Sequence, residues 1–189
     1  MTLRTTLLST TLALAFGAAQ AAGPLRLTVY NADANSFHVN SVLLSGEKEA
    51  LVIDTGFTRA DAYRIAANVL DSGKTLTTIL VSNADPDYYF GAETLQALFP
   101  QAKVVATPAV REKIQAKMAG KLAFWGPKMG VNAPARPVLP EALAGTTLTV
   151  DGQAVELRGT TGPLAHRPYV WVPSLHAIVG NVALFGNMH

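Results

Sequence analysis

The sequence predicts a layered α/β fold formed by one domain, and three observations support this prediction. Segments rich in β-branched and aromatic residues alternate with segments whose apolar residues recur at helical spacing. The pair Asp151-Gly152 lies between two strand-like runs and is a strong hairpin signal. The chain has 189 residues, which is enough for one domain with a substantial core. Strands interleaved with helices, together with hairpins, are typical of α/β layers.

Three strands are expected before the first helix. They are rich in β-branched and aromatic residues, and turn-forming residues separate the first two. His38 would lie within the second strand, with its side chain alternating away from those of Phe37 and Val39. A surface or hydrogen-bonded sheet histidine is therefore the favoured interpretation of His38. The three segments are residues 25–30, 37–44 and 50–53.

The sequence also predicts both ends of the first helix. Thr58 and Asp61 have the spacing of a capping box, and Gly73 is a natural stop. The apolar residues between these ends recur at helical spacing, which favours one continuous helix. The elements expected next are a strand over residues 76–81, a helix over 92–98 and a strand over 103–106.

A third helix is expected to begin at Pro108, after Thr107 as its cap, and to end near Met118. Residues 120–140 are rich in proline and contain Phe124 and Trp125, so we expect an extended loop that covers part of the molecule. The remaining strands form two pairs, residues 146–150 with 153–157 and residues 169–172 with 177–179.

The N-terminus has the pattern of a secretory signal peptide over residues 1–21. A single cation, Arg4, precedes an apolar run over residues 7–19, and Ala19-Gln20-Ala21 is a small-x-small cleavage site. The apolar run is too short to span a bilayer, which needs roughly 20 residues. We therefore expect a periplasmic or secreted protein with a mature domain of residues 22–189 and no membrane association after cleavage.

Composition narrows the classes of partner. The formal charge of the full chain is +2, and loss of Arg4 reduces it to +1. Such weak and scattered charge provides no surface that follows a phosphate backbone, so no nucleic-acid partner is expected. The absence of cysteine excludes disulfides and thiolate metal sites. A small-molecule substrate or ligand is the expected partner.

The loop after the strand at residues 76–81 has the form of a metal-binding loop from which most histidines are missing. Asp85, Pro86 and Asp87 within it also suit a simple turn between a strand and a helix. Two other segments supply context, one ending in Asp54-Thr55-Gly56 and one ending in Gly180-Asn181. The loop itself reads Val81-Ser82-Asn83-Ala84-Asp85-Pro86-Asp87-Tyr88-Tyr89-Phe90-Gly91.

These segments, in this order, resemble the metallo-β-lactamase superfamily. The His-x-His-x-Asp-His signature of the family falls on Asn83, Asp85, Asp87 and Tyr88, so only the aspartate is kept. The resemblance implies an αββα sandwich with a site along one edge of its two sheets. Relatives usually continue beyond Asn181 with further elements. The resemblance therefore implies a sandwich that lacks the usual C-terminal elements, in a chain that is either pared down or a truncated product.

The resemblance also assigns ligand positions, and their chemistry is altered. The first metal site would be formed by Asn83, Asp85 and His166, although Gly162-Pro163 could equally occupy the place of His166. The second site would be formed by Asp87, Tyr88 and Asn181. Zinc prefers imidazole and thiolate ligands, whereas asparagine offers only a neutral oxygen and the tyrosine phenol loses its proton near pH 10. Such an oxygen-rich set implies one divalent cation, either zinc or a harder metal such as manganese or iron, or no metal at all.

Two functions remain open at this point. The first is an exported hydrolase with an altered, oxygen-rich metal site, in which Asp87 and Tyr88 are the candidate catalytic residues. The second is a catalytically silent member of the fold, in which the pocket at the edge of the sheets and the loop over residues 120–140 bind a ligand or partner. In the family an aspartate at the position of Asp54 supports the metal loop through hydrogen bonds, which requires no metal. Nothing in the sequence favours one substrate class over another.

Overall fold

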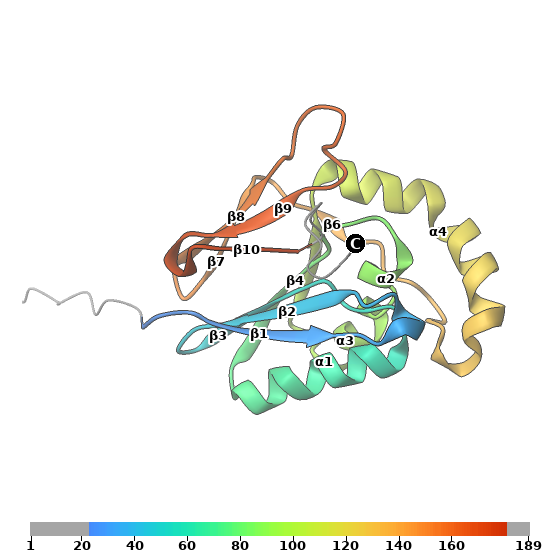
Figure 1. Ribbon diagram of the computed structural model, residues 1–189, viewed down its shortest axis with the longest axis horizontal. Helices are drawn as coiled ribbons and strands as arrows, with labels where there is room; N and C mark the ends of the chain where they lie inside the picture. The colour runs from blue at the N-terminus through green and yellow to red at the C-terminus, as the bar shows by residue number, and fades with distance from the viewer. Residues whose placement is uncertain (1–22, 181–189) are drawn as a thin grey trace, which may run out of the picture.

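Two β-sheets packed face to face form the centre of the molecule, and helices cover the outer face of the larger sheet (Figure 1). The computed structural model describes residues 23–180. The predicted α/β sandwich is confirmed, and most predicted strands lie within two residues of their expected positions. The expected signal peptide, residues 1–21, and the candidate ligand Asn181 lie outside the described part of the chain.

The larger sheet combines an antiparallel half with a parallel half. Strands β1 to β3 pair antiparallel, and strands β3 to β6 pair parallel, so the helices between β3, β4 and β5 serve as crossover connections. Parallel neighbours end at the same edge of a sheet, which places the loops after β3 and β4 side by side. The strand order is β1 (Arg26–Asn31), β2 (Asn40–Ser45), β3 (Glu49–Ile53), β4 (Thr75–Leu80), β5 (Lys103–Ala106) and β6 (Glu141–Ala142).

The smaller sheet is antiparallel throughout. Asp151 and Gly152 connect β7 to β8, and both have positive φ angles, 47° and 76°. This conformation matches the twist of the flanking strands and confirms the predicted hairpin. The strand order is β10 (Ala177–Val179), β9 (Tyr169–Val172), β8 (Gln153–Arg158) and β7 (Thr147–Val150).

Within residues 23–180, four α-helices accompany the larger sheet. The capping box predicted for the first helix is present, because the Thr58 hydroxyl accepts from the Asp61 amide and the Asp61 carboxylate accepts from the Thr58 amide. Gly73 ends this helix in the left-handed conformation, as expected. The helices are α1 (Arg59–Ser72), α2 (Pro86–Tyr89), α3 (Ala92–Leu98) and α4 (Pro108–Met129), with short 3-10 turns at Ala34–Ser36, Gly130–Asn132 and Pro173–Leu175.

Alternation along the strands of the larger sheet divides the core into two layers. On β3, Ala50 and Val52 face the helices, whereas Leu51 and Ile53 face the smaller sheet, and all four side chains are fully buried. The helix layer is completed by apolar residues of α1, α3 and α4, and the layer between the sheets by valines and leucines of β7 to β10. A strand buried on both faces is typical of the parallel half of such sheets.

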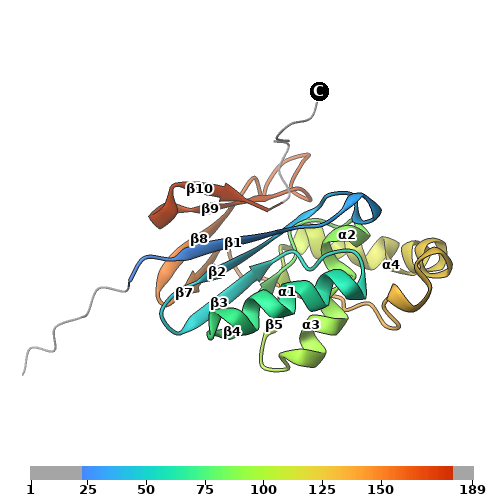
Figure 2. The ribbon, with the colours of Figure 1, turned by 60° about the horizontal axis from the view of Figure 1, so that its bottom comes forward.

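The outer face of the smaller sheet carries no helix from residues 23–180, whereas α1 and α3 lie beneath the larger sheet (Figure 2). Ile178 and Tyr169 on this side are 48% and 37% exposed. No helix between residues 23 and 180 is long and apolar enough to cross a bilayer.

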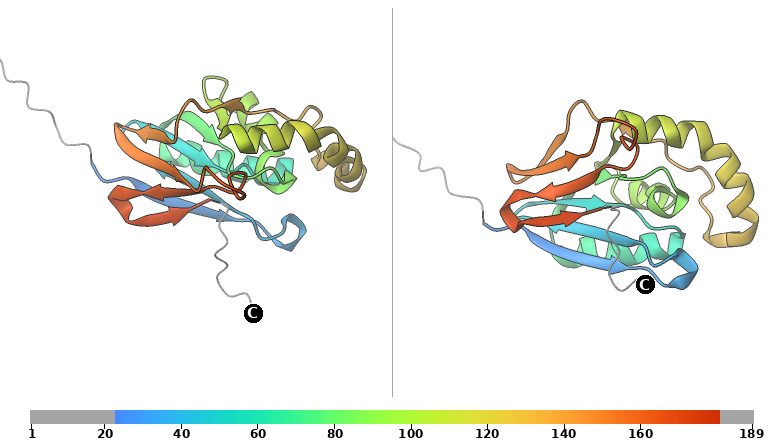
Figure 3. Two further views of the ribbon diagram at one scale, coloured as in Figure 1. Left: turned by 90° about the horizontal axis from the view of Figure 1, so that it is seen from above. Right: turned by 45° about the horizontal axis from the view of Figure 1, so that its top comes forward.

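The prediction that a helix ends near Met118 and gives way to an extended loop is wrong, because α4 continues to Met129 (Figure 3). The prolines of residues 120–140, Pro127 among them, led to that prediction, since proline is unfavourable within a helix. Packing overrides these preferences. A stripe of apolar side chains at helical spacing lies against the core and holds the helix in place: Met118, Leu122, Trp125 and Met129.

The predicted strand at residues 37–44 is also partly wrong, because β2 begins only at Asn40. Phe37 and His38 have φ angles of 59° and 54°, which lie in the left-handed region and are incompatible with a strand. A 3-10 turn over residues 34–36 precedes them, and Phe37 caps it. His38 is therefore an exposed loop residue rather than a sheet histidine.

Candidate functional site

The candidate site is formed where the loops after β3 and β4 meet at one edge of the larger sheet. The Thr55 amide donates to the Tyr88 carbonyl at 2.9 Å, and the Gly91 amide donates to the Gly56 carbonyl at 3.1 Å. These backbone hydrogen bonds join residues that are more than thirty positions apart in the sequence. The loop over residues 81–91 is therefore docked firmly onto the end of β3.

Asp54 fixes the start of this loop. It is fully buried, has a φ angle of 63°, and accepts hydrogen bonds from the Ser82 amide and the Ser82 hydroxyl, each at 2.7 Å. Burial raises the pKa of the Asp54 carboxyl to about 7, against the opposing effect of the two hydrogen bonds from Ser82. The loop-supporting role expected of Asp54 is confirmed, and it depends on no metal.

A hollow of about 270 Å³ opens beside this loop. Its lining combines two carboxylates and an ammonium group with three aromatic rings, and it draws on the 3-10 turn, the β3–α1 loop, α2 and α4. A concave, largely apolar surface with a few convergent charges is the usual form of a small-molecule site. The lining residues are Phe37, Phe57, Asp85, Pro86, Asp87, Lys121 and Trp125.

Asp85 and Asp87 both contribute carboxylates to the hollow, but their surroundings differ. The Lys121 ammonium lies 3.3 Å from Oδ1 of Asp85 and forms an ion pair with it. Among residues 23–180 no side chain forms an ion pair with Asp87. Burial raises the pKa of Asp87 to about 6, the charge of Asp85 adds to the shift, and Lys121 opposes it.

Two other predicted ligands, Asn83 and Tyr88, are not among the residues that line the hollow. Asn83 is buried, and its side-chain oxygen accepts a hydrogen bond from the Asp85 amide at 3.3 Å. Burial raises the pKa of Tyr88 well above its ordinary value, and the negative charges of Asp87 and Asp54 add to the shift. The tyrosine is therefore a neutral phenol at physiological pH rather than a phenolate ligand.

His166 lies in the loop between β8 and β9. Desolvation and the nearby cations Lys113 and Arg167 lower its pKa, so its imidazole is neutral at pH 7. His166 is not among the residues that line the hollow beside Asp85.

The donor set does not fit the pair of metal ions that the histidine signature would hold. Between residues 23 and 180, no three histidine, aspartate or glutamate side chains lie close enough together to hold a metal ion. A tetrahedral zinc site needs about three good protein ligands. Asp85 already has a protein cation as its partner, and Asn83 offers only a neutral amide. The described residues therefore support no chemical step through a metal.

The aromatic side of the hollow consists of three rings in mutual contact. The rings of Phe37 and Phe57 have centroids 5.3 Å apart, and Trp125 contacts both, at 5.6 Å and 5.3 Å, in edge-to-face arrangements. We call Phe37, Phe57 and Trp125 the aromatic wall. Its three members come from three separate segments of the chain, so contacts outside the wall must position these segments.

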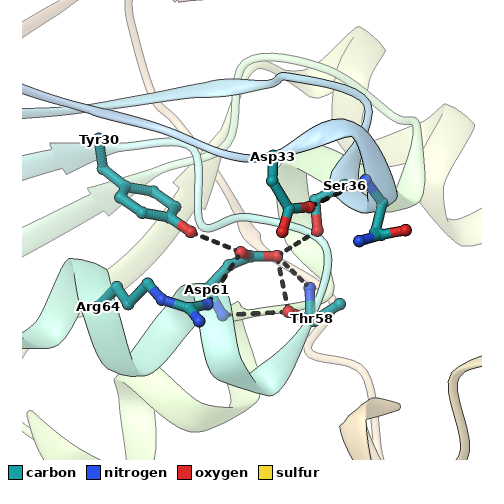
Figure 4. A network of polar contacts seen from close by, with 7 residues as sticks. Tyr30, Asp33, Ser36, Thr58, Asp61 and Arg64 are labelled. Carbon is teal, nitrogen blue, oxygen red and sulfur yellow. Dashed lines mark hydrogen bonds and ion pairs between the residues drawn. The ribbon is translucent and has the colours of Figure 1, made fainter.

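The Asp61 carboxylate positions two of these three segments through hydrogen bonds (Figure 4). It accepts from the Tyr30 and Ser36 hydroxyls, both at 2.6 Å, and from the Thr58 hydroxyl and amide at 2.7 Å and 3.0 Å. Ser36 directly precedes Phe37, and Thr58 directly follows Phe57. One buried carboxylate therefore positions two members of the aromatic wall through their chain neighbours.

The sequence analysis placed residues 120–140 at a possible ligand site but did not single out Lys121 or Trp125 within them, and it missed Phe37 and Phe57 as site residues. The signal for Trp125 and Lys121 was the apolar stripe that continues beyond Met118, because a continuous helix places Lys121 next to Leu122 and one turn before Trp125. No sequence signal located Phe37 and Phe57, since their meeting depends on the tertiary contacts of Asp61. A further hollow, lined by residues of α1 and α3 such as Tyr63 and Thr94, contains none of the predicted ligands.

Comparison with known families agrees with this geometry. Residues 34–179 match the family described as the metallo-beta-lactamase superfamily. The chain belongs to this superfamily. The match includes the loop at residues 81–91, so the altered positions Asn83, Asp85 and Tyr88 and the retained Asp87 lie within a family domain. No curated protein matches this superfamily member.

Solved structures of metallo-beta-lactamases share its fold. The BLEG-1 B3 metallo-beta-lactamase superposes with a TM-score of 0.61 at 16% identity, over 81% of this chain and 70% of that one. MEM-A1, a subclass B3 enzyme from a soil metagenome library, gives 0.53 at 22% identity, over 80% and 55%. A metallo-beta-lactamase family protein from Thermus thermophilus gives 0.52 at 19%, over 79% and 56%. Identities this low establish the fold, and the chain spans little more than half of the last two structures.

Proposed function

We propose that this member of the metallo-beta-lactamase superfamily binds a small molecule at the edge of its sheets without a metal ion. The single observation that carries the proposal is the ion pair between Lys121 and Asp85, with 3.3 Å between Nζ and Oδ1. Asp85 occupies a position of the metal-binding signature, and a protein ammonium compensates its charge there. A metal ion at this carboxylate would have to displace Lys121 from a charge that the protein already compensates.

The remaining features of the hollow support binding over metal-dependent hydrolysis. A hydrolytic metal site must lower the pKa of a bound water to near 7, which requires a tightly held cation. The described residues offer instead an aromatic wall and a second carboxylate, Asp87, which are suited to the recognition of an organic ligand. In this proposal the protein keeps a hollow at the edge of its sheets, and the hollow binds a ligand in place of a hydrolytic metal ion.

A second candidate function is a hydrolase that holds one hard cation between Asp85 and Asp87. The observation in its favour is that both carboxylates line the same hollow and act on each other electrostatically. Two aspartates with water molecules are an oxygen-rich set suited to manganese more than to zinc. The two candidates differ in whether the protein retains a metal ion.

Metal content separates the two candidates. The protein would be purified without chelators, incubated with zinc, manganese and iron(II), desalted, and analysed by elemental mass spectrometry. We expect metal far below one ion per chain in the wild type and in an Asp85→Ala/Asp87→Ala control. A near-stoichiometric ion that the double variant loses would overturn the proposal and establish the metal-dependent candidate, with that ion as the one to use in hydrolase assays.

We also propose that the protein is exported. The proposal is supported by the residue pattern at the N-terminus, where Arg4, the apolar run and Ala19-Gln20-Ala21 follow the order of a signal peptide. The expected product of a secreting host has Ala22 as its first residue. Intact-mass measurement of the protein from periplasmic and cytoplasmic fractions checks this, and a full-length chain found only in the cytoplasm would refute it.

A further inference from the structure

We propose that the ligand of the hollow is a small organic cation, an arylalkylammonium or alkylammonium, whose charged head pairs with Asp87 and whose apolar body lies on the aromatic wall. This inference rests on the proposed function, because it assigns a ligand class to the same metal-independent site. It is argued from the charges of the lining, from the contacts of two lysines, and from the shape and size of the hollow.

The charges of the lining favour a cation. Two carboxylates, Asp85 and Asp87, face one ammonium, Lys121, and only Asp85 forms an ion pair with it. Asp87 is half-buried and has no ion-pair partner within residues 23–180. A bound cation would give this carboxylate a partner and bring the hollow to neutrality, whereas an anion would add to the excess negative charge. Partly desolvated carboxylates gain most from such a partner.

Two of the chain's own lysines, Lys121 in the hollow and Lys128 beside it, make the kinds of contact that an ammonium ligand would use. Lys121 places its ammonium on Asp85 inside the hollow. Lys128 places its ammonium 3.4 Å from the centroid of the Phe124 ring and 5.8 Å from that of Trp125, a member of the aromatic wall. Both distances lie within the range of cation–π attraction. An external ammonium would make the same two kinds of contact, with a carboxylate and with ring faces.

The aromatic wall supplies the apolar half of the site. Phe57 is buried, whereas Phe37 is 51% exposed at the rim and is held there in a left-handed backbone conformation. A large apolar side chain fixed in this way leaves surface that a ligand can cover. The Asp61 network holds the segment that carries Phe37, so the wall is in place before any ligand binds. Such preorganisation lowers the entropic cost of association.

The size of the hollow limits the ligand. Its volume of about 270 Å³ lies just below the usual range of small-molecule sites. One aromatic ring or a short branched chain, joined to the ammonium by two or three carbons, fills such a space. Larger antibiotics or peptides would extend beyond it. Phenethylammonium is therefore a suitable probe.

The test compares three probes of similar shape and different charge on the mature, metal-free protein. Phenethylammonium, 2-phenylethanol and 3-phenylpropionate would be titrated while amide chemical shifts are recorded by NMR. We expect phenethylammonium to bind about ten-fold more tightly than the alcohol, and the carboxylate to bind most weakly. Of the three probes, only phenethylammonium should bind more weakly when the salt concentration is raised. The largest shift changes should fall on Phe37, Asp87 and Trp125.

Matched variants assign the contacts. Asp87→Asn keeps the shape of the side chain and removes its charge, so the affinity for phenethylammonium should fall about ten-fold, to that of the alcohol. Phe37→Ala should lower the affinities for 2-phenylethanol and for phenethylammonium to the same extent. Asp71→Asn, which changes an exposed carboxylate at the far end of α1, should leave all affinities unchanged. Circular dichroism of each variant confirms that it is folded.

The outcomes separate this inference from the proposed function. Equal binding of all three probes, or unchanged affinity in Asp87→Asn, would overturn the choice of a cation while metal-independent binding still held. Tighter binding of 3-phenylpropionate would overturn it in favour of an anion placed on Lys121. No binding of any probe to protein shown to be metal-free would overturn the ligand class. A stoichiometric metal in the same preparation would overturn the proposed function as well.

Discussion

Replacing Gly91 by alanine is expected to destabilise the protein by at least about 3 kcal/mol, through a clash that the backbone cannot relieve. A Cβ at this position would lie 2.0 Å from the Thr55 carbonyl oxygen, 2.9 Å from the carbonyl carbon and 3.0 Å from Cβ of Ala62. Thr55 cannot retreat, because its amide is bonded to the Tyr88 carbonyl at 2.9 Å. The alanine variant must separate the two loops that form the candidate site.

Urea unfolding followed by circular dichroism measures this effect. Gly73→Ala is the matched control, since Gly73 has a φ angle of 65° but a Cβ added there would meet no other atom within 4 Å. Its expected cost is about 1 kcal/mol, from backbone conformation alone. If the two variants lost the same stability, the close approach of Gly91 to Thr55 would not exist in solution.

The second large effect is expected for Asp61→Ala, at about 3 kcal/mol. The variant leaves the Tyr30 and Ser36 hydroxyls and the Thr58 amide without their acceptor in a buried setting. It also releases the segments that carry Phe37 and Phe57, so binding of any ligand at the aromatic wall should weaken. Asp71→Ala on the same helix is exposed and should change the free energy of unfolding by no more than about 0.5 kcal/mol.

The contribution of Asp61 should depend on pH in a predictable direction. Burial acts to raise the pKa of Asp61, but hydrogen bonds from Ser36, Thr58 and Tyr30 outweigh it and hold the pKa below its ordinary value. The stability gained from this carboxylate is therefore complete above the unfolded pKa, near about 4, and is lost as the pH falls through the lower folded pKa. Urea midpoints of the wild type and of Asp61→Asn should converge on acidification, and a constant difference down to about pH 2 would contradict this assignment.

Much of the fold was predictable because its signals are local. The capping box at Thr58, the Gly73 stop and the Asp151-Gly152 hairpin each depend on a few adjacent residues, and all three were confirmed. Helix α4 was not predicted in full, because glycine and proline preferences were opposed by tertiary packing of the stripe that includes Leu122 and Trp125. Residues 37 and 38 were misassigned because a left-handed pair has no strong signature when it contains no glycine.

The sequence pointed to the site residues that the family resemblance marks, and it did not reveal the long-range contacts between them. Asp85 and Asp87 were identified from the signature positions, and the hydrogen bonds of Asp54 were anticipated by family resemblance. The partner of Asp85 could not be foreseen, since Lys121 is 36 positions away and its approach requires the full length of α4. Asp61 was recognised only as a helix cap, because its bonds to Tyr30 and Ser36 are long-range.

The support of the loop at residues 81–91 has an evolutionary consequence. Asp54, Thr55 and Gly91 hold this loop, and none of them is a position of the histidine signature. Ancestral histidines could therefore be exchanged singly for residues such as Asn83 and Asp85 while the protein still folded. A scaffold in which the ligands of a cofactor carry little of the folding energy can pass through inactive intermediates that remain soluble and open to selection for another task.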